Sequence, residues 1–482
     1  MTDSPKVLVY LWFDIEDYVT RDSDGLPLVA VEILKKYGVR ATSKIVAEKL
    51  RRLRENGRED VISAISGYDI GYHLDTHSRH PTLYEYLANA DVLTGAKEFM
   101  AREMEGLEFV KQIFGRIPSC FGHPGPIWAP HVYPALQESG IPVYLDETSI
   151  LNLNDQPYWY CGILNLNGAN RNFIVFDFSF QAPTGIKGLK RKFKAIHDRL
   201  RSKGGGAVSI LFHLHTAINR KFWDEVNFAN GKNRTRDQYE EPPRQPPEVT
   251  ERAWKDFEEL IRYVSSFGDV QFITASDAAK IYHDSGELVV CYAELKQVAR
   301  HFGSSTSHLR IGDSYLSPAG AFYTVTKALA HYADEGTLPE KIEVKEPLGP
   351  MAPARTRGRK RLRTEDFLAS IKATLDSIES QRCLLTSIAV GDYAELAPHD
   401  YLATVCKLLG LVILREDLPE SIHTVKGKPP QVAHVSGVNF MKACKWKVLP
   451  RNFKAPKILE QAKLQAWTLR PAVPSSTAIV AS

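Results

Sequence analysis

The sequence lacks the features of a secreted, membrane-spanning or nucleic-acid-binding protein. Its six cysteines are scattered and form no CxxC pair, which argues against a disulfide framework or a cysteine-based zinc finger. No apolar run reaches roughly 18 residues, and the start "MTDSPKVLVYLWFDIEDY" lacks the three parts of a secretion signal. A formal charge of +4 over 482 residues is too small to predict nucleic-acid binding. We therefore expect a cytoplasmic protein with neither a membrane span nor a nucleic-acid partner.

Two common catalytic signatures are also missing. There is no G-x-S-x-G nucleophile elbow, and "SKGGGAV" lacks the Lys-Ser/Thr ending of a phosphate-binding loop. A 44% hydrophobic and 10% aromatic composition is nevertheless ordinary for a globular protein, and the length predicts two or three domains.

The first 280 or so residues alternate between strand and helix patterns. Buried strands are predicted at "KVLVYLWF", "GYDIGYH", "IPVYLDE" and "AVSILFH", and amphipathic segments separate them. This alternation is typical of a parallel sheet, open or closed as a barrel. In such folds the reactive residues lie at the carboxyl ends of the strands.

After about residue 285 the pattern changes to an internal repeat. Residues 315–344 match residues 395–424 at a shift of 80, and each unit has a proline at a predicted helix start and ends in LPE-x-I. The basic stretch "MAPARTRGRKRLRTEDF" between them is interpreted as a solvated linker. We expect a first domain over 1–284 and a mainly helical accessory domain over 285–482.

Acids and histidines follow two of the predicted strands. Asp14, Glu16 and Asp17 come directly behind "YLWF", where three carboxylates repel one another unless a cation joins them. His73 and His77 are four residues apart, and His80 is a competing partner for His77. Imidazoles together with a carboxylate suit zinc and related divalent ions.

Four segments in order, "FDIEDY", "HLDTHS", "GRIPSCFGHPG" and "SILFH", resemble the motifs of the polysaccharide deacetylases of carbohydrate esterase family 4, the NodB-homology domain. The resemblance covers about residues 6–282 and implies a distorted (β/α) barrel of about seven strands. It implies Asp14 as general base and Asp17 as metal ligand. Glu16 is the alternative ligand, because "DIED" replaces two adjacent aspartates. The resemblance also implies that His73 and His77 are the histidine ligands and that His80 lies in the pocket wall or behind a ligand.

The third motif departs from the family pattern. Gly122 stands where family members have an arginine that orients the base, and Arg116 lies six residues too early to replace it. Gly125 replaces a tyrosine whose backbone amide helps to hold the oxyanion, and its own N–H can keep that role. His123 and Trp128 are expected to rebuild this wall of the pocket.

The last motif implies His213 as the acid that protonates the leaving group, with His215 as the runner-up. The polar, aromatic and proline-rich stretch after it is long enough for an ordered active-site loop. Within it, Trp223, Asp224 and Asn227 are candidates for contacts with a sugar.

Together these features predict a metal-dependent hydrolase of a non-peptide carbon–nitrogen bond, with one divalent ion, Zn²⁺ by preference. N-deacetylation of a saccharide is the reaction that the resemblance implies. Two alternatives remain: hydrolysis of a non-sugar amide or ureide on the same barrel, and a catalytically silent carbohydrate-binding protein.

Overall fold

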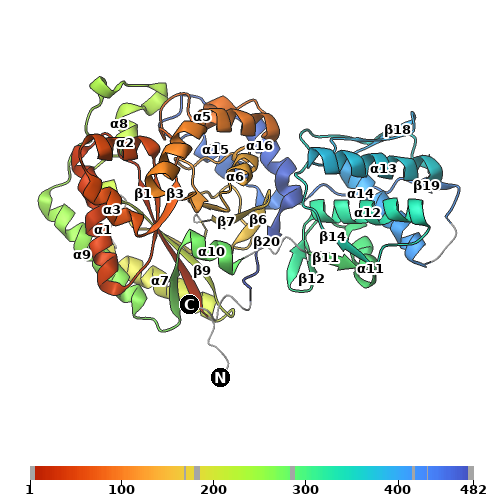
Figure 1. Cartoon of the computed structure of the whole chain (residues 1–482), viewed down its shortest axis with the longest axis horizontal. Coiled ribbons are helices and arrows are strands. Elements are labelled where there is room, and N and C mark those ends of the chain that lie inside the picture. The colour runs from red at the N-terminus through yellow and green to blue at the C-terminus, as the bar shows by residue number, and fades with distance from the viewer. Residues whose placement is uncertain are drawn as a thin grey trace.

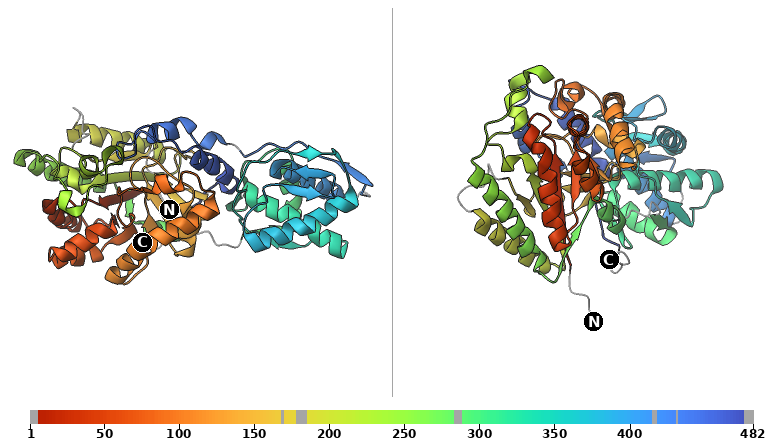
Figure 2. Two further views of the ribbon diagram at one scale, coloured as in Figure 1. Left: turned by 90° about the horizontal axis from the view of Figure 1, so that it is seen from above. Right: turned by 60° about the vertical axis from the view of Figure 1, so that its left-hand side comes forward.

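The computed structural model describes residues 6–167, 170–177, 185–282, 288–414, 418–430 and 432–475. They form a larger lobe that carries a curled sheet and a smaller lobe of helices and short strands (Figures 1 and 2). The predicted domain boundary at 284/285 lies outside the described residues.

The larger lobe is built on one sheet. Its strand order is β20-β6-β7-β5-β4-β3-β2-β1-β9-β8, and β10 pairs with the first half of β1. All neighbours are parallel except at the β20-β6-β7 edge, where both pairings are antiparallel. The strands are β1 (Val7–Ile15), β2 (Thr42–Ile45), β3 (Asp69–Tyr72), β4 (Cys120–Phe121), β5 (Val143–Asp146), β6 (Tyr158–Tyr160), β7 (Ile163–Asn167), β8 (Phe173–Val175), β9 (Gly206–His213), β10 (Val270–Ile273) and β20 (Arg470–Pro471).

Helices follow most of the parallel strands and cover the outside of this sheet (Figure 1). In α9, for example, Phe257, Leu260, Ile261 and Val264 lie on one buried face, as expected for an amphipathic helix on a core. The distorted (β/α) barrel predicted from the sequence is confirmed. The helices are α1 (Leu26–Tyr37), α2 (Ala47–Glu55), α3 (Glu59–Ser66), α4 (Leu83–Leu87), α5 (Val92–Phe114), α6 (Val132–Glu138), α7 (Gly185–Arg201), α8 (Trp223–Asn227), α9 (Pro247–Ser265) and α10 (Ala275–Ile281).

Strand β1 lies at the centre of this lobe and sets the position of the reactive residues. All nine of its residues are buried, because β2 and β10 pair along one edge and β9 along the other. The register places Asp14 opposite Lys44 of β2 and opposite His213 of β9. Three charged or ionisable side chains therefore lie in one row across the sheet.

The smaller lobe contains the predicted repeat, and each unit extends further upstream than the sequence match. Each has the order β-α-β-β-α-β, its outer strands pair antiparallel, and its inner strands form a hairpin. The first unit is β11 (Val289–Cys291), α11 (Tyr292–Phe302), β12 (Leu309–Ile311), β13 (Ser314–Leu316), α12 (Pro318–Glu335) and β14 (Lys341–Glu343). The second is β16 (Arg361–Arg363), α13 (Thr364–Gln381), β17 (Ile388–Val390), β18 (Ala394–Leu396), α14 (Pro398–Leu414) and β19 (Ser421–His423).

Helix α12 packs on α13, and α11 packs on α14. Because α11 corresponds to α13 and α12 corresponds to α14, these two contacts between the units are equivalent. The predicted helix starts at Pro318 and Pro398 are confirmed, since these residues begin α12 and α14. The basic stretch carries β15 (Arg357–Gly358), which pairs with β18, and β16. It is thus part of this lobe's structure and not only a linker.

The chain then returns to the barrel, which differs from the single accessory domain expected over 285–482. Helices α15 (Gly437–Ala443) and α16 (Pro456–Leu464) lie against the larger lobe (Figure 1), and β20 extends the edge of its sheet. Phe440, Leu449 and Ile458 belong to the same buried cluster as the barrel residues. The smaller lobe, in contrast, has a separate core. The repeat is therefore an insertion between two parts of the larger lobe.

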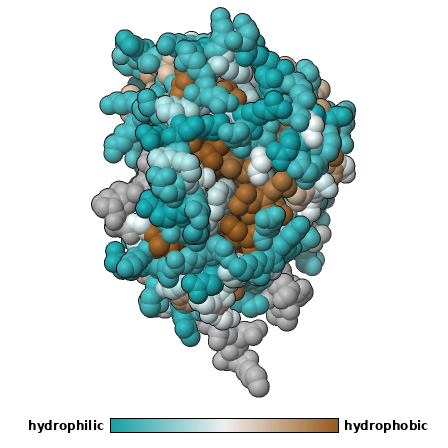
Figure 3. Space-filling view, turned by 90° about the vertical axis from the view of Figure 1, so that its left-hand side faces the viewer, coloured by the Kyte–Doolittle hydropathy of each residue, from teal (hydrophilic) through white to brown (hydrophobic). Residues whose placement is uncertain are grey.

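Figure 3 shows one outer face of the larger lobe. On the face in Figure 3, hydrophilic side chains predominate and hydrophobic ones gather mainly near the centre. Among the described residues, no helix combines the length and the apolar character needed to cross a bilayer.

Candidate active site

A cavity of about 370 Å³ opens at the carboxyl ends of the central strands. This is the location that parallel α/β sheets favour for binding sites. Most of the residues predicted from the sequence line it. The described lining residues are Asp14, Glu16, His73, His77, His123, Gly125, Pro126, Asp146, Glu147, Val175, Asp177, His213, Phe222, Asp224, Glu225 and Trp446.

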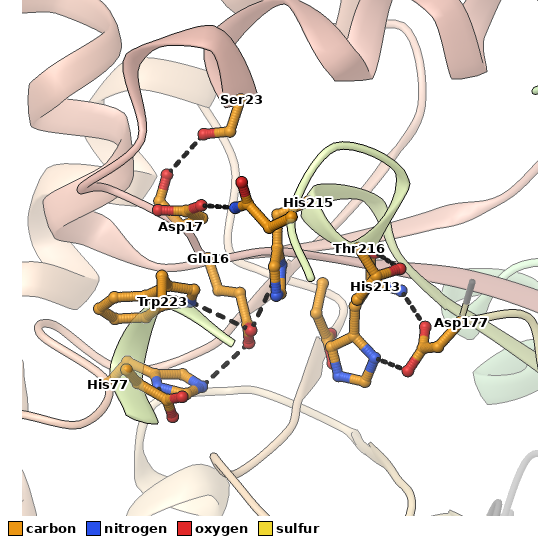
Figure 4. A network of polar contacts seen from close by, with 12 residues as sticks. Glu16, Asp17, Ser23, His77, Asp177, His213, His215, Thr216 and Trp223 are labelled. Carbon is orange, nitrogen blue, oxygen red and sulfur yellow. Dashed lines mark hydrogen bonds and ion pairs between the residues drawn. The ribbon is translucent and has the colours of Figure 1, made fainter. Parts of the chain in front are cut away.

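Glu16 lies at the centre of this site, and Figure 4 shows its carboxylate facing His77. Its Oε2 is 3.0 Å from Nε2 of His77 and 3.3 Å from Nε2 of His73. One ligand atom from each of the three residues falls within 4.8 Å of the other two. Two nitrogens and one carboxylate oxygen form a typical donor set of a catalytic zinc site.

The hydrogen bonds behind these imidazoles fix which nitrogen faces the cavity. Nδ1 of His73 lies 2.8 Å from the carbonyl oxygen of Gly122, so it must be the protonated nitrogen. The Ser78 hydroxyl donates to Asp224 at 2.9 Å, so at 2.6 Å it accepts from Nδ1 of His77. Nε2 is therefore the nitrogen that each ring, when neutral, would offer to a cation beside Glu16, as metal-binding histidines do.

The charges around the site also suit a cation. Burial opposes ionisation of Glu16, but His77 and His73 outweigh it and hold the pKa of Glu16 well below its usual value. Nε2 of His77 has no hydrogen-bond partner within the described part of the chain, although it is buried. A buried nitrogen aimed at a carboxylate without a hydrogen bond is the position that a metal ion would satisfy. The residues present thus fit a divalent ion.

The loop after β3 brings the two histidines together without forming a helical turn. His73 directly follows β3, and Leu74 and His77 have φ values of 68° and 58°. Such left-handed conformations are uncommon for residues other than glycine and are enriched at functional sites.

Asp17, the ligand that the resemblance implies, points away from the imidazoles. Its Oδ1 accepts hydrogen bonds from the backbone N–H groups of Val19 and Thr20, and its Oδ2 accepts one from Asn219 at 2.9 Å. Figure 4 shows it on the far side of Glu16 from His77. The structure brings the alternative, Glu16, next to the two imidazoles, and Asp17 ties the loop after β1 to the segment after β9.

Asp14 lies between two positive or potentially positive groups. Its Oδ1 is 3.1 Å from Nζ of Lys44, and its Oδ2 is 3.4 Å from Nε2 of His213. The carboxylate is buried, with 4% of its surface exposed, but it reaches the cavity. Asp14 is therefore close to Glu16, His73 and His77, and Lys44 contacts it from the side opposite the cavity.

His213 is oriented by Asp177, a residue that sequence analysis missed. The carboxylate accepts from the backbone N–H of His213 at 3.0 Å and lies 2.8 Å from its Nδ1 (Figure 4). Burial alone would lower the pKa of His213, but Asp177, and then Glu16 and Asp14, raise it well above the usual value. The ring is thus held protonated, with Nε2 facing Asp14.

His215, the runner-up to His213, lies behind Glu16 in a 3-10 turn. Its Nδ1 is 3.7 Å from Oε1 of Glu16, and burial lowers the pKa of His215 to about 3. A histidine that stays neutral cannot act as an acid at ordinary pH. His213 is the better candidate for that role.

The third motif forms the opposite wall. His123 lies 2.5 Å from both the Tyr144 hydroxyl and Asp146, and burial lowers the pKa of His123. Gly125 has a φ of 64°, and a Cβ atom there would lie 2.6 Å from the ring of Trp446. Trp446 comes from the returning C-terminal segment and covers this part of the cavity.

The remaining predicted residues divide into two groups. Asp224 lines the cavity, and burial raises its pKa to about 7, while Trp223 donates a hydrogen bond to Glu16 at 3.3 Å. His80, Trp128 and Asn227 are not part of the described cavity wall. His80 pairs with Glu85, Trp128 donates to Tyr133, and Asn227 bonds the backbone around Trp223 and Glu240.

Sequence reasoning missed Lys44, Asp146, Glu147, Asp177, Phe222 and Trp446. Three of these carried a usable signal, because Asp146, Glu147 and Asp177 follow apolar strands in the same manner as Asp14. The half-buried Glu147 has a pKa raised to about 7 by burial.

No protein-family model matches the sequence, and no curated protein matches it. Among solved structures, a putative polysaccharide deacetylase from Mycobacterium smegmatis is similar at 17% identity and a TM-score of 0.38, over 58% of this chain and 91% of that chain. A probable polysaccharide deacetylase from Pseudomonas aeruginosa PAO1 is similar at 14% identity and a TM-score of 0.38, over 59% and 93%. The PuuE allantoinase is similar at 13% identity and a TM-score of 0.39, over 59% and 92%.

Proposed function

We propose that this protein binds one divalent ion, Zn²⁺ by preference, through Glu16, His73 and His77 and hydrolyses a non-peptide carbon–nitrogen bond. The reaction we favour is N-deacetylation of a saccharide. One observation carries the proposal: an N₂O ligand set, a carboxylate held by a lysine and a histidine held by an aspartate all meet in one cavity. These are the groups that metal-assisted amide hydrolysis needs.

A divalent ion bound there would supply Lewis acidity, which lowers the pKa of a water and polarises the acyl oxygen. Asp14, next to the ligand set, accepts the proton of the attacking water. The water oxygen bonds to the acyl carbon as the carbon–nitrogen bond breaks, and the products are a carboxylic acid and an amine.

His213 is the acid that donates a proton to the leaving group. It starts protonated because Asp177 stabilises the imidazolium, and it gives the proton on Nε2 to the departing nitrogen. Asp14 and His213 are cross-strand neighbours, so both can reach the same scissile bond. The backbone N–H of Gly125 is our candidate donor to the developing oxyanion.

The cavity supports a substrate that is small or presents a single sugar residue. Its volume of about 370 Å³ is at the low end for small-molecule sites. Carboxylates dominate its wall, and Trp446 and Phe222 offer aromatic surface, a combination suited to a neutral, hydroxyl-rich ring. The order of the four sequence motifs is the further reason to choose a saccharide.

The test is acetate release from N-acetylated oligosaccharides by protein of known metal content. We expect stoichiometric metal and acetate release from the wild type. Asp14→Asn should retain the metal and lose release, and His73→Ala should lose both. Activity on small amides or ureides alone would favour the non-sugar hydrolase. Metal-free, inactive protein that still binds glycan would establish the silent binder and end the proposal.

A further inference from the structure

Lys44 is a charged side chain in a position where a strand normally carries an apolar residue. It lies on β2, has 0% of its surface exposed, and is the direct cross-strand neighbour of Asp14. Its Nζ is 3.1 Å from Oδ1 of Asp14 and 4.2 Å from the centre of the Trp12 ring. A buried ammonium is costly unless a carboxylate compensates it, and Asp14 is its ion-pair partner.

Among the described residues, Asp14 lines the cavity and Lys44 does not. The ammonium therefore lies behind the carboxylate as seen from the cavity. Its direct contact with the cavity wall is through Asp14, whose Oδ2 is left to face His213.

Two glycines leave the space that Lys44 occupies. A Cβ atom at Gly71 of β3 would lie 2.9 Å from Cγ of Lys44. A Cβ atom at Gly122 would lie 2.7 Å from Cδ of Lys44, and it would come still closer to Nζ. Both contacts are tighter than real Cβ atoms tolerate, so any side chain at either position would displace the lysine.

We infer that Lys44 is a positioning residue that keeps the Asp14 carboxylate aimed into the cavity, and that Gly122 is required to house it. This inference rests on the proposed function, since it assigns a role to a group that acts on the base. The inference also explains why Gly122 can stand in place of the arginine of the third motif. Here the cation beside the base comes from β2 and not from the segment after β4.

The test separates the charge of the side chain from its length. Lys44→Ala should lower kcat by about 10- to 100-fold, while KM and metal content change less than about twofold. Lys44→Met, which keeps the length of the side chain without its charge, should lower kcat to a similar extent. An unchanged kcat in either variant would overturn the inference.

Lys49 provides a matched control. It is equally buried, lies 2.5 Å from Asp24, and is not in the described cavity wall. Lys49→Ala should lower the melting temperature as Lys44→Ala does, yet keep kcat within about twofold below that temperature. An equal loss of kcat in both variants would mean that loss of stability explains the effect, and the inference would fall.

A wild type that releases no acetate would defeat the proposed function but would leave the pairing testable. Lys44→Ala should lower the melting temperature by roughly 5–10 °C in the wild type and by much less in Asp14→Asn, where the partner charge is already gone. Additive shifts would show that the two side chains are not coupled.

Discussion

Glu16 and Asp17 are adjacent carboxylates with opposite surroundings, and this difference can be tested. Glu16→Gln should abolish stoichiometric metal binding, because an amide replaces the one anionic ligand. Asp17→Asn should keep the metal. It should cost about 1–3 kcal/mol of stability, because an amide donor can then face the donor of Asn219. Elemental analysis after dialysis and thermal melting of both variants make the comparison.

Metal loss in Asp17→Asn with metal retained in Glu16→Gln would reverse the assignment. The sequence contained a physical reason to prefer Glu16. Alternate side chains of a strand share a face, so Asp14 and Glu16 point to one side and Asp17 to the other. The family resemblance implied Asp17 as the ligand. The alternation of side chains along the strand favours Glu16, which is the residue that the structure places next to the imidazoles.

Residues at strand ends were predictable, but their partners were not. Asp14, His73, His77 and His213 follow apolar strands, and the parallel arrangement brings such ends together. Lys44 lies inside a strand and gave no comparable signal. Its role appears only in the register that places it opposite Asp14.

Helix α5 is joined to strand β3 by a buried carboxyl, which makes this contact sensitive to pH. Oε2 of Glu103 accepts hydrogen bonds from the Tyr72 hydroxyl and the Asp75 backbone N–H, both at 2.7 Å. Burial nevertheless raises the pKa of Glu103 from 4.5 to about 7. The folded chain thus binds more protons than the unfolded chain between these values, so this contribution to stability falls as pH rises from about 4.5 to about 7.

Glu103→Gln should remove this pH dependence, because a neutral amide still accepts both hydrogen bonds. The wild type should lose about 3 kcal/mol relative to the variant across that window. Urea unfolding at several pH values measures it, and Glu105→Gln, an exposed carboxyl on the same helix, is the control. Parallel stability curves for the wild type and Glu103→Gln would contradict the assignment.

The repeat shows why sequence matching found only half of each unit. The second halves, β13-α12-β14 and β18-α14-β19, keep one register, and the shift of 80 residues detects them. In the first halves, α11 has 11 residues and α13 has 18, so no constant shift aligns them. Equal pairing of the outer strands, β11 with β14 and β16 with β19, reveals the full unit.

The division of the chain into two cores was the least predictable feature. Composition changes near residue 285, but nothing in the composition indicates that the chain returns to the barrel after the repeat. The return depends on long-range burial: Phe440, Leu449 and Ile458 complete the barrel core, and Trp446 covers the cavity. Such contacts between distant segments leave little periodic trace in a single sequence.

Two matched phenylalanines test this division. Phe440 of α15 and Phe367 of α13 both have 0% of their surface exposed, but they belong to different cores. Truncating either to alanine should cost about 3–5 kcal/mol in its own unit. Calorimetry should show that Phe440→Ala lowers the transition that releases the metal, while Phe367→Ala lowers the other one. If Phe367→Ala instead lowered the metal-releasing transition as much as Phe440→Ala does, the two cores would unfold as one, and the C-terminal segment would not belong specifically to the barrel.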